Sequence, residues 1–174
     1  MTLQPLTLDG AKQMLKLREQ YRAAMRTNQP LNEEDQEMWF YRVTQRNAPE
    51  RWWQIVEPAR LEKLQDGMLP VMQKTVGYCG VEKIDWIGRT GELSLLMEGT
   101  DEEWFKTFSD LLDRAFDELA LREVHAEVYY CSPDRDRWVL VADSYRAQVA
   151  TLPMRKFWRG RVWDADWISI RMPS

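Results

Sequence analysis

The clearest alternation of apolar and polar positions lies within residues 91–130. Apolar residues recur there at helical spacing: Trp104, Phe108, Leu111, Leu112, Ala115, Phe116 and Leu119. Charged residues fill the positions between them, which predicts an amphipathic helix with one buried face. Thr100 and Glu103 form the Thr-x-x-Glu pattern of a capping box, so we expect the helix to begin at about Asp101.

Two segments on either side of this helix predict strands. Residues 92–97 form a short apolar run, and residues 123–130 alternate between apolar and polar side chains. Alternation with a period of two is typical of a strand with one buried face. A strand, a helix and a second strand of these lengths predict a parallel pair of strands joined by a right-handed crossover.

The remaining patterns extend this unit in both directions. Strands are expected at 3–8, 51–57 and 75–86, helices at 9–26, 32–47 and 132–145, and a hairpin at 148–158 and 161–172. Residues 58–74 show no sustained period and contain Gly67 and Pro70. We therefore expect one domain over 1–174, with an insertion at about 58–74 that acts as a surface excursion or as a contact surface.

Composition narrows the classes of function. The 174 residues carry a net charge of −4 and are 44% hydrophobic, which fits a soluble globular protein and gives no indication of a nucleic-acid or membrane partner. Cys79 and Cys131 are too few for a disulfide framework, and a reducing, cytoplasmic compartment is the simpler expectation. His125 is the single histidine, and no zinc-binding spacing occurs, so no metal site is expected.

Four local patterns occur in a familiar order. Residues 76–85 contain Val-Gly-Tyr-Cys-Gly-Val, residues 91–96 read Gly-Glu-Leu-Ser-Leu-Leu, residues 115–121 read Ala-Phe-Asp-Glu-Leu-Ala-Leu, and residues 160–164 run from Gly to Asp. Together they resemble the GNAT superfamily of acyl-CoA-dependent N-acyltransferases, and within it the ribosomal-protein-type N-acetyltransferases of bacteria. The resemblance implies an α+β fold with a mixed central sheet of about seven strands, flanked by about four helices.

The resemblance also implies a site. In this family the two central strands splay apart and the pantetheine arm of the cofactor, acetyl-CoA, pairs with the exposed backbone, while the diphosphate lies at the start of the next helix. By position, the cofactor would contact Leu95, Leu96, Met97, Gly99 and Thr100. Glu92 would be the base that deprotonates an amine acceptor, and Tyr145 or Tyr130 the acid that protonates the leaving thiolate.

The sequence departs from the family at the phosphate loop. The family pattern is Arg/Gln-x-x-Gly-x-Gly/Ala, whereas residues 97–103 read Met-Glu-Gly-Thr-Asp-Glu-Glu, with one glycine and four acids. Acidic side chains near a helix N-terminus repel a diphosphate and compete for the same amides. This degenerate motif argues against tight binding of CoA.

Two functions of different classes therefore remain open. One is an N-acetyltransferase that transfers an acetyl group from acetyl-CoA to an amine of a small molecule or a protein. The other is a catalytically silent GNAT-fold module of bacterial or phage origin, with a protein partner in place of CoA. In the second case Glu92 is a solvated strand-edge carboxylate and Tyr145 a packing residue. The acyl group, the acceptor and any homo-oligomer stay open.

Overall fold

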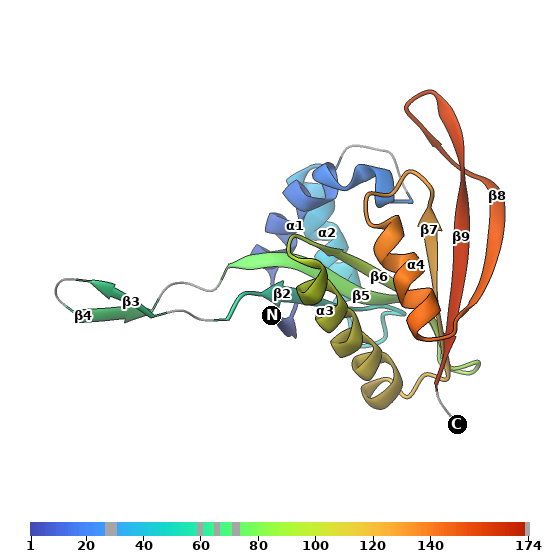
Figure 1. Ribbon diagram of the computed structural model, residues 1–174. Helices are drawn as coiled ribbons and strands as arrows, with labels where there is room; N and C mark the ends of the chain where they lie inside the picture. Colours follow the sequence, from blue (N-terminus) through green and yellow to red (C-terminus); the bar gives the residue numbers. More distant parts are fainter. Residues whose placement is uncertain (27–30, 59–60, 65–66, 71–73, 173–174) are drawn as a thin grey trace.

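A seven-stranded mixed sheet forms the centre of the molecule, with the order β1–β2–β5–β6–β7–β9–β8 (Figure 1). The computed structural model describes residues 1–172 except 27–30, 59–60, 65–66 and 71–73, and for 61–70 the backbone alone. The strands are β1 Thr2–Pro5, β2 Arg51–Val56, β5 Thr75–Asp85, β6 Thr90–Met97, β7 Glu123–Tyr129, β8 Gln148–Trp158 and β9 Arg161–Arg171.

Helices cover both faces of this sheet. They are α1 Leu8–Gln20, α2 Glu33–Val43, α3 Asp101–Asp113 and α4 Arg135–Ser144, with a 3-10 turn η1 at Arg22–Ala24 and a π-helical turn η2 at Arg114–Glu118. One apolar cluster joins α1 and α2 to Tyr78 and Leu96, and the other joins α3 and α4 to Leu93, Leu95 and Met97 (Figure 1). The expected architecture of about seven strands and about four helices is confirmed.

The two central strands pair over a short distance only. β6 and β7 run parallel, and their ladder consists of Thr90 with Glu123, Gly91 with Val124 and Glu92 with His125. Beyond this last pair the strands separate, although each keeps its antiparallel neighbour on the other side. The splay expected between these strands is therefore present, and it leaves backbone groups of β6 and β7 without a ladder partner.

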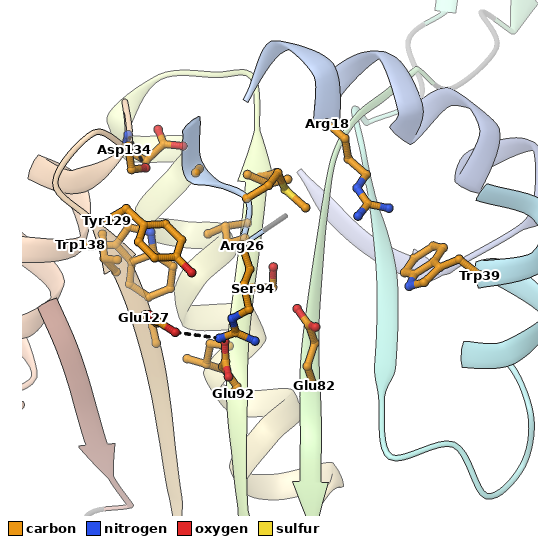
Figure 2. Close-up of a pocket in the computed structure, with 18 of the residues that line it drawn as sticks. Arg18, Arg26, Trp39, Glu82, Glu92, Ser94, Glu127, Tyr129, Asp134 and Trp138 are labelled. Atoms are coloured by element: carbon orange, nitrogen blue, oxygen red, sulfur yellow. Dashed lines mark hydrogen bonds and ion pairs between the residues drawn. The ribbon is translucent and has the colours of Figure 1, made fainter. Parts of the chain in front are cut away.

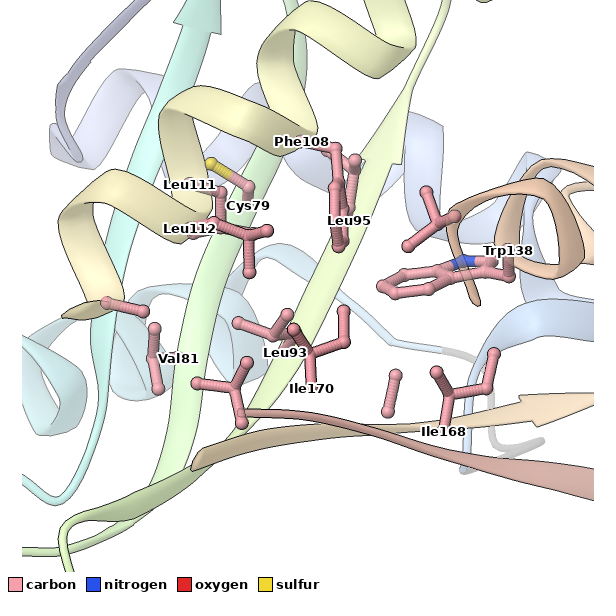
Figure 3. Packing of buried hydrophobic residues seen from close by; sticks show 14 of the residues in the cluster. Cys79, Val81, Leu93, Leu95, Phe108, Leu111, Leu112, Trp138, Ile168 and Ile170 are labelled. Carbon is pink, nitrogen blue, oxygen red and sulfur yellow. The ribbon is translucent and has the colours of Figure 1, made fainter. Parts of the chain in front are cut away.

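The amphipathic helix packs as its pattern predicts. Trp104 and Phe108 are fully buried, their rings stack at 5.6 Å between centroids, and Trp138 of α4 meets both edge-on. Figure 3 shows Phe108 and Trp138 beside Leu95 of β6. The helix does not stay α-helical to its end, because it widens into η2, where Phe116 is only partly buried.

The first helix is shorter than its pattern predicts. Thr7, rather than Asp9, caps α1, because the Thr7 hydroxyl accepts a hydrogen bond from the Gly10 amide at 3.0 Å. The helix ends at Gln20, where the chain turns and crosses toward β7. The hydroxyl of Tyr21 donates to the Met97 carbonyl at 3.2 Å and fixes this turn against the end of β6.

Two further strands, β3 Leu61–Leu64 and β4 Gly67–Pro70, form a separate antiparallel hairpin that projects from the main sheet (Figure 1). It lies within the segment expected to be an insertion, and the single domain with this insertion stays a prediction. None of the helices in the described part of the chain is long and apolar enough to cross a membrane.

Candidate active site in the splay of the central strands

The splay opens a cavity of about 580 Å³ on the side of the sheet that α1 and α2 cover. Its floor consists of Leu93–Leu96 of β6 and Ala126–Tyr129 of β7, and Met25 and Arg26 close it from the segment after η1 (Figure 2). Trp138 of α4 reaches it from the opposite face. The cavity therefore lies between two strand edges whose backbone groups face it rather than another strand.

Carboxylates from three strands line this cavity: Glu82 of β5, Glu92 of β6 and Glu127 of β7. Glu82 and Glu92 are direct cross-strand partners, so their side chains project from the same face of the sheet. Alternation along β7 brings Glu127 to that face as well, because Ala126 and Val128 pack in the opposite core. The site is consequently rich in negative charge at the base of the splay.

Glu92 and Glu127 are almost inaccessible, with side chains 10% and 3% exposed, and both are paired. Arg26 donates to both of them, at 3.0 Å to Glu127, and so bridges the two separating strands (Figure 2). Lys83 lies 2.8 Å from Glu92, and Arg155 lies 2.9 Å from Glu127. Burial raises the pKa of Glu127, but hydrogen bonds from Arg155 and Arg26 outweigh it and lower this pKa below its ordinary value.

Glu82 is the candidate base that the sequence did not single out. Burial, followed by the negative charges of Glu92 and Glu50, raises the pKa of Glu82 to about 7. A carboxyl with this pKa exchanges protons near neutral pH, which an ordinary glutamate does not. Figure 2 shows its side chain pointing into the cavity, on the same face as Ser94. Glu82 is therefore a carboxyl of this cavity that can gain and lose a proton near neutral pH.

This pKa predicts a pH-dependent stability. The folded-state pKa of Glu82, about 7, lies above its ordinary value of 4.5, so protonation favours the folded state. Its contribution to the free energy of unfolding is complete below pH 4.5 and is lost as pH rises through about 7. We expect the free energy of unfolding of Glu82→Gln to fall less than that of the native protein as pH rises through about 7, by on the order of 1–3 kcal/mol. Chemical denaturation of both proteins at several pH values measures it, and parallel curves would contradict it.

Neither tyrosine expected as the acid belongs to the described residues that line the cavity. The Tyr130 hydroxyl donates to Asp166 at 3.1 Å, and Arg135 lies over its ring. Tyr145 caps the C-terminal end of α4, and its ring meets Phe108 edge-on. Tyr129 does line the cavity, and burial together with the charge of Glu127 raises its pKa. It is therefore better placed than the other two to hold a proton beside a ligand.

The loop after β6 leads into α3, and the expected capping box is present there. The Thr100 hydroxyl accepts from the Glu103 amide at 3.3 Å, and the Glu103 carboxylate accepts from the Thr100 amide at 2.9 Å. Arg137 of α4 donates to the Gly99 carbonyl at 3.2 Å and to Asp101 at 2.9 Å. Two amides of the helix start are thus already engaged within the chain.

These features test the fit of acetyl-CoA. The open edges of β6 and β7 match a pantetheine arm, and Leu95 and Leu96 lie on the cavity as expected. Met97, Gly99 and Thr100 lie at the strand end and loop, outside the described cavity lining. The acidic, capped start of α3 matches a diphosphate poorly. No cluster of three or more metal-ligating side chains occurs among the described residues.

Known structures share this fold. Spermidine N-acetyltransferase SpeG from Vibrio cholerae in complex with CoA and spermine is 15% identical, with a TM-score of 0.78 over 98% of this chain and 94% of that one. A dodecameric structure of the spermidine N-acetyltransferase from Vibrio cholerae, in an intermediate state, is 15% identical, with a TM-score of 0.74 over 98% of this chain and 92% of that one. A mutant of SpeG from Vibrio cholerae is 16% identical, with a TM-score of 0.73 over 98% of this chain and 95% of that one.

No protein-family model matches the chain, and the search of curated proteins gives no match. The structural likeness covers nearly all of both chains, so the fold is that of the GNAT N-acetyltransferases. Fold alone does not define function, because function depends on the residues of the site.

Proposed function

We propose that this protein is an N-acyltransferase that transfers an acetyl group from acetyl-CoA to a cationic amine. The observation that carries the proposal is the splay of β6 and β7, which opens onto carboxylates of three neighbouring strands. The open strand edges suit an extended pantetheine arm, and the carboxylates suit a positively charged acceptor. The amine-binding, CoA-bound neighbour of the same fold supports this assignment.

The chemistry of the chain's own residues follows from their positions. Acetyl-CoA supplies an acyl group activated as a thioester. An amine is protonated at neutral pH and must lose its proton before its nitrogen can attack, and Glu82 is the acceptor for that proton. Glu92 and Glu127, which are held in place by ion pairs, attract and orient the ammonium form. Tyr129 is the donor to the leaving sulfur, in preference to Tyr130 and Tyr145.

The phosphate loop offers few favourable contacts to the diphosphate of the cofactor. Asp101 and Glu102 precede Glu103 in the first turn of α3, where the helix dipole would otherwise favour an anion. Arg137 of α4 contacts the loop, but it is paired with Asp101 and Asp134. We therefore propose that CoA binds weakly, with a dissociation constant on the order of millimolar.

Replacing the loop acids tests this weakness. We expect the Asp101→Ala, Glu102→Ala and Glu103→Ala triple variant to bind CoA roughly 10- to 100-fold more tightly, because it loses three like charges and frees the Thr100 amide. Calorimetric titration with CoA measures the change. Asp117→Ala with Glu118→Ala, in the last turn of the same helical segment, is the control and should leave the affinity unchanged. A native dissociation constant near 10 micromolar would contradict the argument.

The proposed activity is tested by release of free thiol from acetyl-CoA. The assay uses millimolar acetyl-CoA, in view of the weak phosphate loop, and a panel of monoamines, diamines and lysine peptides. We expect release that depends on a cationic amine and rises with pH through about 7, as Glu82 loses its proton. Release that is independent of the amine would indicate hydrolysis and would contradict acyl transfer.

A silent GNAT-fold module is the second candidate, and two observations favour it. The capping box occupies the helix start that a diphosphate needs, and Arg26 lies across the base of the splay. Such a module would show neither a thermal shift with CoA nor thiol release with any amine. Under either function we retain a cytoplasmic location as a prediction. The dodecameric neighbour makes a homo-oligomer worth testing by light scattering.

A further inference from the structure

We propose that Arg26 is an internal ligand of the acceptor pocket. Its side chain occupies a cation site made by Glu92 and Glu127, and an alkylammonium or alkylguanidinium ligand binds there by displacing it. The inference rests on the proposed function only in taking the occupant of this cavity to be an amine. The cation site itself follows from the described contacts.

The geometry of the contact suits replacement by another cation. Glu92 belongs to the last ladder pair of β6 and β7, and Glu127 lies two residues beyond that pair. A single nitrogen of Arg26, Nη2, donates to both carboxylates. One ammonium nitrogen carries three donors and can therefore make the same two contacts without a planar guanidinium group.

Displacement of Arg26 leaves neither Glu92 nor Glu127 without a partner. Glu92 keeps Lys83 at 2.8 Å, and Glu127 keeps Arg155 at 2.9 Å. An unpaired charge at positions this deeply buried would be strongly unfavourable, so these outer cations make the exchange feasible. The side chain of Arg26 is itself 46% exposed and lines the cavity, so it can move into solvent.

The backbone that carries Arg26 is anchored on several sides. Lys156 of β8 donates to the carbonyls of Arg22, at 3.0 Å, and of Met25, and the Cys131 thiol donates to the Ala23 carbonyl at 3.5 Å. These contacts hold the backbone directly before Arg26, so we infer that displacement moves its side chain. Because the pocket accepts a ligand only when this side chain is out, the apparent affinity falls with the fraction of open molecules.

The test measures binding of n-butylamine and n-butylguanidine by calorimetry, without acyl-CoA. We expect Arg26→Ala and Arg26→Gln to bind both probes at least about 10-fold more tightly than the native protein, because the internal competitor is gone. Arg26→Lys keeps a competing cation and should stay closer to the native affinity. Arg171→Ala is the matched control, since it removes an arginine from Glu123 of the same strand, outside the described cavity lining, and leaves Arg26 in place; it should change affinity less than about twofold.

Unchanged or weaker binding by folded Arg26→Ala and Arg26→Gln would overturn the proposal, as would an equal gain in Arg171→Ala. If both neutral variants fail to fold, addition of n-butylguanidine must restore their folding transition, and no restoration overturns the proposal. The outcome is separable from the transfer activity. Tighter probe binding without thiol release supports the cation site and contradicts the proposed acyl transfer. Thiol release without tighter probe binding supports acyl transfer and contradicts the cation site.

Discussion

Trp104→Ala is expected to lower the free energy of unfolding by about 3–5 kcal/mol. Trp104 is fully buried between α3, α4 and the sheet, where its ring stacks on Phe108 and meets Trp138 edge-on. Truncation removes these contacts and leaves a cavity that the surrounding helices cannot fill completely. Urea denaturation followed by circular dichroism measures the loss.

Two matched variants separate packing from other effects. Trp104→Phe keeps an aromatic ring and removes an indole N–H for which the described residues offer no hydrogen-bond partner, so it should cost less than half as much as alanine. Lys106→Ala, on the exposed side of α3, should change stability by no more than about 0.5 kcal/mol. A loss under about 1 kcal/mol for Trp104→Ala would show that the helix face is not packed as described.

Glu82→Gln is expected to lower kcat/KM for the amine roughly 100- to 10,000-fold, the usual contribution of a positioned general base. Glutamine fills the same space but cannot accept the ammonium proton, so the loss should fall mainly on kcat. The measurement is the initial rate of thiol release over a range of amine concentrations. A rate within about threefold of the native protein would exclude Glu82 as the base.

Glu92→Gln separates the two candidate bases. Glu92 is held by Lys83 and Arg26, so its neutral analogue should weaken amine binding. The rise of the rate with pH should persist but move to lower pH, because the charge of Glu92 helps to raise the pKa of Glu82. Glu82→Gln should lose this rise. If the rise instead disappears in Glu92→Gln and persists in Glu82→Gln, the base is the residue that the family resemblance indicated.

Most elements of the fold can be predicted from local sequence patterns. The helix at Trp104–Leu112 and the alternating strand at Glu123–Tyr129 carry strong periods, because each buries one face against a core. The end of the first helix was not accessible, since Tyr21 is fixed by a hydrogen bond to Met97, 76 residues away. Likewise, the π-helical turn at Arg114–Glu118 keeps the apolar spacing of an α-helix and leaves no separate trace in the sequence.

The residues of the site can be predicted from the sequence only in part. Glu92, Leu95 and Leu96 follow from the order of the family's patterns and lie on the cavity. Glu82 was missed, although it is an acid inside a predicted strand, because its importance depends on the register that places it opposite Glu92. Arg26 was missed because its partners lie 66 and 101 residues further along the chain, and no local period encodes such a contact.

Acyl transfer to a cationic amine is the activity that we propose for the splay between β6 and β7. The most direct measurement is mass spectrometry of 1,4-diaminobutane after incubation with the protein and millimolar acetyl-CoA. The account predicts that monoacetylated diamine accumulates with the native protein and falls by at least about 100-fold with Glu82→Gln. No acetylated product above the protein-free control would contradict the account and favour the silent module.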